Sequence, residues 1–195
     1  MPMRRCEYLD WLVFTRQPRP YDARILRLLE AIAQTPTGAP LVAYVLRRWP
    51  RIVWGRPPVG NAFAFPWPLE TIIMRDAGDE ATNLEVLAHE LAHLARWRGH
   101  LVGSLEQEYD AYLTGVRVRA EWEGLDWRDP NGPAARRWPL LFGHEASPQR
   151  FMAWVRSRNA FYALLPWNQP RTLPEVVRAL ITQAGFGVKM LLKRA

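Results

Sequence analysis

The segment LAHELAHLARWRGHLVGSLEQEYDAY, residues 87–112, contains three of the chain's four histidines and a group of acidic residues. His89 and His93 are four positions apart, so on a helix both imidazoles leave the same face one turn apart and can bind one ion. Glu90 lies between them. In this H-E-x-x-H arrangement two histidines bind zinc, and the glutamate acts as general base on a zinc-activated water. Leucine and alanine residues surround the motif and favour a helix, so we expect one zinc ion per chain here.

A catalytic zinc site needs a third protein ligand and an open position for water. His100 is the first candidate, because an extended motif, H-E-x-x-H-x-x-G-x-x-H, supplies a third histidine further along the chain. The chain departs from this motif twice: Arg96 stands at the glycine position, and His100 comes one residue late. We therefore predict that His100 is a surface histidine in a turn, and we look for the third ligand on the following helix.

That helix offers two acidic candidates. The apolar pattern predicts one helix over residues 83–97, and the capping box S-L-E-Q begins a second helix over residues 104–124. The short turn between them makes the two helices antiparallel neighbours, which brings His93 and Glu108 to a similar height. Glu108 is therefore the preferred third ligand. Glu106, which lies closer to the turn, remains the alternative.

The rest of the chain indicates an α+β fold with a small sheet. Helical spacing of apolar residues predicts two helices before the motif, and proline and glycine residues then separate three short β-branched or aromatic runs. The prolines at 57, 58, 66 and 68 confine the segments that contain them to sheet edges or turns. The expected elements are helices 21–34 and 41–49, strands 51–55, 61–65 and 71–76, the two helices above, a loop at 126–139, and helices 148–165 and 173–184.

Length and composition favour one compact domain over residues 1–195. We divide it into an N-terminal helical part (1–50), a central part with the sheet and the zinc site (51–124), and a C-terminal helical part (125–195). The net charge of +7 comes almost wholly from arginines spread along the chain, and no nucleic-acid-binding motif accompanies them, so a nucleic-acid partner is not expected.

Three features bear on the compartment. Cys6 is the only cysteine, which excludes an internal disulfide, and the N-terminal segment has no apolar core of the kind found in signal peptides. No apolar run is long enough to span a bilayer. We expect a soluble cytoplasmic protein; the sequence predicts no particular oligomeric state.

Three segments within residues 60–155 resemble the gluzincin metallopeptidases, especially the HtpX-like and CAAX-prenyl-protease-like branch and the soluble minigluzincins. GNAFAF followed by TIIMRD resembles the family's N-A-F-A segment and the strand after it. VLAHELAHL resembles its zinc helix. SLEQEYDAYLTGVR is similar to its third-ligand helix, E-x-x-A-D-x-x-G, and this match gives the ligand role to Glu108, although Tyr112 replaces the family's aspartate.

The resemblance implies a zincin-like fold, in which an edge strand packs on the motif helix. Asn61 and Ala62 would then contact the backbone of an extended peptide substrate by strand addition, although an ordinary protected edge strand is the alternative. The segment HEASPQRF resembles the family's H-P-x-x-x-x-R-I element, which contributes a histidine near the site and points to His144. The alternative is that His144 is a loop histidine. The oxyanion donor could be His144, Tyr109 or Tyr112.

The function that these residues predict is that of a soluble zinc metalloendopeptidase acting on a peptide or protein. Glu90 would take a proton from the water and pass it to the leaving amine. Two alternatives remain: a regulatory protease dedicated to one partner substrate, and a non-catalytic zinc-containing binding module with a basic surface. The intact Glu90 favours an enzyme, because a scaffold needs the histidines but not the base.

Overall fold

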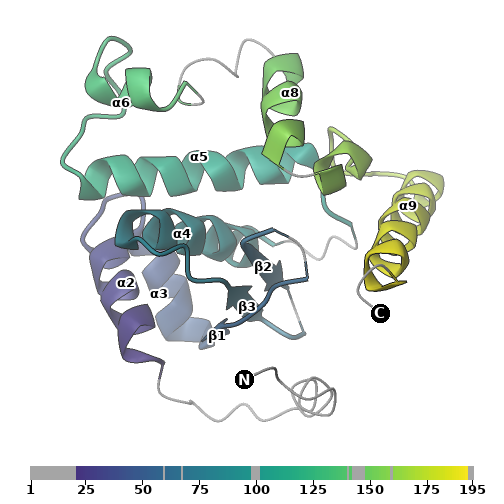
Figure 1. The fold of residues 1–195 in the computed structure, drawn as a ribbon, viewed down its shortest axis with the longest axis horizontal. Helices are drawn as coiled ribbons and strands as arrows, with labels where there is room; N and C mark the ends of the chain where they lie inside the picture. Colours follow the sequence, from purple (N-terminus) through teal and green to yellow (C-terminus); the bar gives the residue numbers. More distant parts are fainter. Residues whose placement is uncertain are drawn as a thin grey trace.

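The computed structural model describes residues 21–58, 60–66, 68–97, 102–139, 141, 148–158 and 160–192. Helices combine with a small mixed sheet that packs on α4, which confirms the predicted α+β class (Figure 1). The elements are α2 (Ala23–Ala33), α3 (Ala39–Arg48), β1 (Arg51–Trp54), β2 (Ala62–Phe65), β3 (Thr71–Met74), α4 (Glu80–Arg96), α5 (Leu105–Trp122), α6 (Pro133–Arg137), α8 (Pro148–Arg158), the 3₁₀ helix η1 (Ala160–Leu164) and α9 (Leu173–Leu192).

The sheet has three strands in the order β1-β3-β2. The central strand β3 pairs in parallel with β1 and antiparallel with β2, which leaves β2 at an edge. The three short runs therefore form strands, as predicted. Along β2 the side chains alternate: Ala62 and Ala64 pack against the helical core, while Phe63 and Phe65 contact each other with their ring centres 4.8 Å apart.

Helices α4 and α5 lie side by side, and α4 separates α5 from the sheet (Figure 1). Asp79 caps α4 by accepting a hydrogen bond from the Thr82 backbone, so the helix begins a turn earlier than the apolar pattern predicted. Ser104 caps α5 through the Gln107 backbone N–H, as the capping box predicted. These caps fix where each helix starts, and hence which residues face each other across the pair.

Two apolar clusters meet at α5. The first contains α2, α3, the sheet and α4, and it includes Ala111 and Val118 of α5. The second joins α5 to α6, α8 and η1, and it includes Leu113 and Val116. Because opposite faces of α5 are buried in different clusters, this one helix holds the motif-bearing half of the chain against its C-terminal elements.

Three expectations for the C-terminal part are wrong. The loop at 126–139 contains the short helix α6, which begins at Pro133, a residue already suited to the first helical position. The helix expected over 148–165 ends at Arg158, and the chain tightens into η1. Tyr162 in η1 and Leu165 just after it both pack in the second cluster. Helix α9 continues past Ala184 to Leu192.

Candidate metal centre

His89 and His93 lie on adjacent turns of α4 and point to the same side of it. Their Nε2 atoms are 3.1 Å apart, and their rings are nearly perpendicular, with centres separated by 4.8 Å. Both side chains are largely buried. The spacing of four residues thus produces the paired imidazoles that the sequence predicted.

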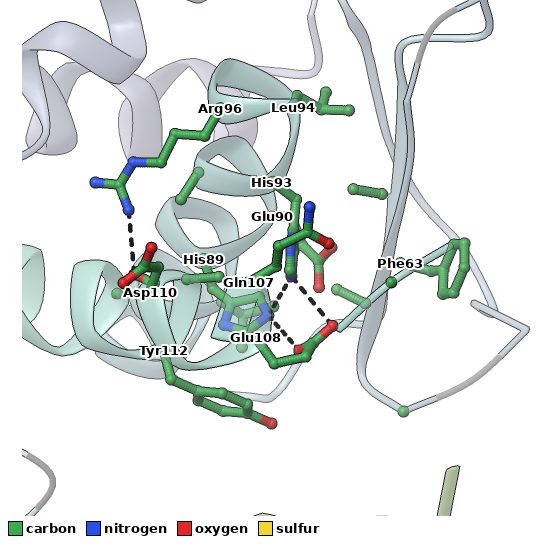
Figure 2. A pocket seen from close by; sticks show the side chains of 18 of the residues that line it. Phe63, His89, Glu90, His93, Leu94, Arg96, Gln107, Glu108, Asp110 and Tyr112 are labelled. Atoms are coloured by element: carbon green, nitrogen blue, oxygen red, sulfur yellow. Dashed lines mark hydrogen bonds and ion pairs between the residues drawn. The ribbon is translucent and has the colours of Figure 1, made fainter. Parts of the chain in front are cut away.

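Glu108 completes the group from the facing helix α5 (Figure 2). Its Oε2 lies 3.5 Å from His89 Nε2, and its Oε1 lies 3.4 Å from His93 Nε2. Ligand atoms bound about 2.0–2.1 Å from a tetrahedral zinc lie about 3.3–3.4 Å from one another. The three side chains are therefore spaced as metal ligands are, and this His-His-Glu group could hold a metal ion.

The alternative ligand, Glu106, is exposed and stands outside this group. The close approach of α4 and α5 explains why Glu108 reaches the histidines. Ala111 lies three residues after Glu108 and Gly115 lies seven after it, so all three occupy one face of α5, and both small residues are buried. Larger side chains at these two positions would hold the helices apart.

The charges of the neighbouring side chains shift the pKa values of His93 and Glu108 in opposite directions. Burial alone would lower the pKa of His93, but the Glu108 carboxylate favours its charged form, and the pKa rises to about 9. For Glu108 burial opposes ionisation, yet the two histidines prevail and hold its pKa far below the usual range. Within the described residues the buried Oε2 of Glu108 accepts no hydrogen bond. A carboxylate whose two oxygens each face a different imidazole suits a cation between the three side chains.

Glu90 is buried on the same helix, with 7% of its surface exposed. Burial raises the pKa of its carboxyl, against the opposing effects of His89 and His93 and a hydrogen bond from the Ala64 backbone. A raised pKa suits a carboxylate that must accept a proton and later release it.

A groove of about 980 Å³ runs past the metal group, and β2, α4, α5 and η1 line it.

The strand β2 has a free edge. In an antiparallel pair, successive residues direct their main-chain groups alternately toward and away from the partner strand. The Asn61 carbonyl accepts a hydrogen bond from the Arg75 N–H, so it faces β3. The main-chain groups of Ala62 and Ala64 consequently face away from β3, along the free edge of the strand.

Tyr112 supports the metal group in a way that the sequence did not predict. Its ring packs edge-on against His89, with ring centres 4.4 Å apart, in the place where the resembled family has an aspartate. Its hydroxyl lies 3.0 Å from that of Tyr162, which lines the same groove. Burial raises the pKa of Tyr162, and the charge of Glu108 adds to the shift, so this phenol stays protonated.

Tyr162 is the groove residue that sequence reasoning missed. Fifty positions separate it from Tyr112, and no spacing rule connects η1 with α5. Of the other candidate donors, Tyr109 packs against Phe151, with ring centres 5.1 Å apart. His144 and His100 lie outside the described residues.

Comparison of this chain with protein-family models, with curated proteins and with solved structures finds no match. In the part of the chain that the structure describes, no helix combines the length and the apolarity needed to cross a bilayer.

Proposed function

We propose that this chain is a zinc metalloendopeptidase of the gluzincin type, with a zincin-like arrangement of β2, α4 and α5. His89, His93 and Glu108 would bind zinc, and Glu90 would act as the general base. The observation that carries the proposal is that a His-His-Glu group and a buried carboxylate of raised pKa share one groove with a free strand edge. A purely structural metal site needs neither the base nor the groove.

Zinc in this site would act as a Lewis acid and lower the pKa of a water molecule toward neutrality. Glu90 takes the proton of the attacking water and passes it to the leaving amine. Its buried position keeps bulk water from competing for that proton. Tyr162, held protonated beside Tyr112, can donate a hydrogen bond into the groove where negative charge develops on the substrate carbonyl oxygen.

An extended peptide fits the free edge of β2. The outward main-chain groups of Ala62 and the carbonyl of Ala64 would pair with it by strand addition. Asn61 is exposed at the start of the strand. Its carbonyl accepts a hydrogen bond from the Arg75 N–H, so its side chain would make the contact with a substrate. A strand edge that pairs with an extended chain suits a peptide or protein substrate, and this mode of binding requires no nucleic acid.

The test is zinc content and peptide hydrolysis, measured on untagged parent, Glu90→Gln and Glu80→Gln. Glu80 is an exposed carboxylate in the first turn of the same helix, so its variant controls for the loss of a charge. We expect about one zinc per chain in all three proteins, and a loss of hydrolysis of about 10²-fold to 10⁴-fold in Glu90→Gln alone.

Two results would count against the proposal. A parent that takes up no zinc at micromolar concentration would remove the metal centre. A zinc-loaded parent that hydrolyses nothing in a broad peptide library would favour one of the two alternatives, a protease dedicated to one partner or a non-catalytic binding module.

A further inference from the structure

Helix α9 carries an exposed apolar face. Leu173, Val177, Leu180 and Ile181 are between 39% and 76% exposed, and their spacing places them along one side of the helix. Four of the nine large apolar residues exposed in the described part of the chain therefore gather on this one element. Single exposed leucines are ordinary, whereas a contiguous apolar face marks an interaction surface.

A different side of α9 attaches it to the rest of the molecule. The helix contacts η1, and Ala179 is buried while Val176 is partly buried. Figure 1 shows α9 at the periphery, beyond η1 and away from α4 and α5. The attachment thus uses one narrow side and leaves the face with Val177 and Ile181 uncovered by the described residues.

The charges on and beside this helix are mainly positive. Arg171, Arg178 and Lys189 lie within residues 171–192, where Glu175 is the only acidic residue. The Glu175 carboxylate accepts hydrogen bonds from the backbone N–H groups of Arg171 and Thr172, so it serves the start of the helix. An amphipathic helix with an apolar face and an excess of positive charge on and beside it resembles helices that lie in a membrane interface.

We propose that α9 docks this protein on an anionic lipid surface. Charge complementarity selects this occupant over a second copy of the chain. Each copy carries a net charge of +7, and pairing two α9 helices would bring their cations together, whereas an anionic surface attracts them. The helix lies in the plane of the surface, with Val177 and Ile181 inserted among the lipid chains. The proposal is independent of the metal centre.

The test is co-sedimentation with vesicles of phosphatidylcholine alone or mixed equally with phosphatidylglycerol. We expect the full chain to bind the anionic vesicles, to release them as salt rises, and to bind neutral vesicles at least tenfold more weakly. The double variant Val177→Glu/Ile181→Glu should lose binding at least tenfold. Leu46→Glu, which places one such carboxylate on an exposed leucine of α3, should bind nearly as the parent does.

Arg178→Gln provides a second variant that alters only charge; it should weaken anionic binding and leave the circular dichroism spectrum unchanged. Absence of binding to anionic vesicles would overturn the proposal, as would undiminished binding of the double variant or equal binding to neutral vesicles. Sedimentation velocity tests the other occupant. If the parent is a dimer, the double variant is a monomer and neither protein binds lipid, the apolar face of α9 binds a second copy of the chain instead.

Discussion

Gly115 of α5 lies directly against the backbone carbonyl of Glu85 on α4, and a Cβ at position 115 would be 2.7 Å from that oxygen. The contact is with backbone, which cannot rotate away as the end of a long side chain can. It lies two helical turns after Glu108 on the same face of α5. The distance between the helices, and with it the reach of Glu108 toward the histidines, therefore depends on the absence of a side chain here.

Gly115→Ala should destabilise the protein by about 1–3 kcal/mol, because the methyl group forces α4 and α5 apart. The affinity for zinc should also fall, because Glu108 would lie further from the two histidines. Gly185→Ala is the control, since a Cβ at Gly185 in α9 meets nothing within 4 Å; there alanine should stabilise by about 0.5–1 kcal/mol. Urea unfolding of both variants measures the effect. Equal effects of the two substitutions would show that the contact with Glu85 is unimportant.

Zinc should stabilise the parent against thermal unfolding, by about 2.7 kcal/mol at a free concentration of about 100 Kd. Glu108→Gln should abolish most of this effect, because the substitution removes a charged ligand between two imidazoles. Glu106→Gln should retain it, since Glu106 is exposed and outside the group. Melting temperatures with and without zinc, together with elemental analysis, provide the measurement; loss of the effect in Glu106→Gln would reverse the ligand assignment.

Removal of the Tyr112 ring should loosen the metal centre. The ring packs on His89, so Tyr112→Ala should lower zinc affinity by about 10–100-fold, the range seen when support behind a ligand is lost. Tyr112→Phe keeps the ring and loses the hydroxyl that lies 3.0 Å from that of Tyr162; its zinc affinity should stay close to the parent's. Competition with a fluorescent chelator measures both. Equal losses would mean that the hydroxyl, and not the ring, supports His89.

Asp76 should contribute an acid-sensitive part of the stability. Hydrogen bonds from Asn83, the Gly78 backbone and Arg24 lower its pKa to about 2, from an unfolded value of about 3.9. Because the folded pKa is the lower one, the contribution is complete above about pH 4 and disappears as the pH falls through 2.

The Asp76→Asn variant should therefore be less stable than the parent at neutral pH, and the difference should shrink between pH 4 and pH 2. Thermal melts of the two proteins across this range provide the comparison. Stability curves that run parallel down to pH 2 would contradict the assigned role of the carboxylate.

The sequence predicted the parts of the structure that depend on local patterns. Short β-branched or aromatic runs separated by proline and glycine predict the three strands, and Ser104 marks the start of α5. The position of Glu108 followed from two helix boundaries and the rise per residue, which is why it was preferred to Glu106. Both distances from its carboxylate to the histidines agree with that preference.

Other features depended on contacts between distant segments. The pairing of Tyr112 with Tyr162 arises where η1 packs on α5, and apolar periodicity carries no information about such a meeting. The helix expected over 173–184 stops just before Gly185, but one glycine costs a helix only about 1 kcal/mol, and α9 continues to Leu192. The break after Arg158 likewise reflects packing on the second cluster.

The three side chains of the metal group all come from one run of twenty residues, from His89 to Glu108. Closing so short a segment costs little chain entropy, and local contacts form early in folding. During synthesis this run leaves the ribosome before η1 and α9 exist. A metal ion could therefore bind to a nascent two-helix hairpin before the wall that contains Tyr162 has formed.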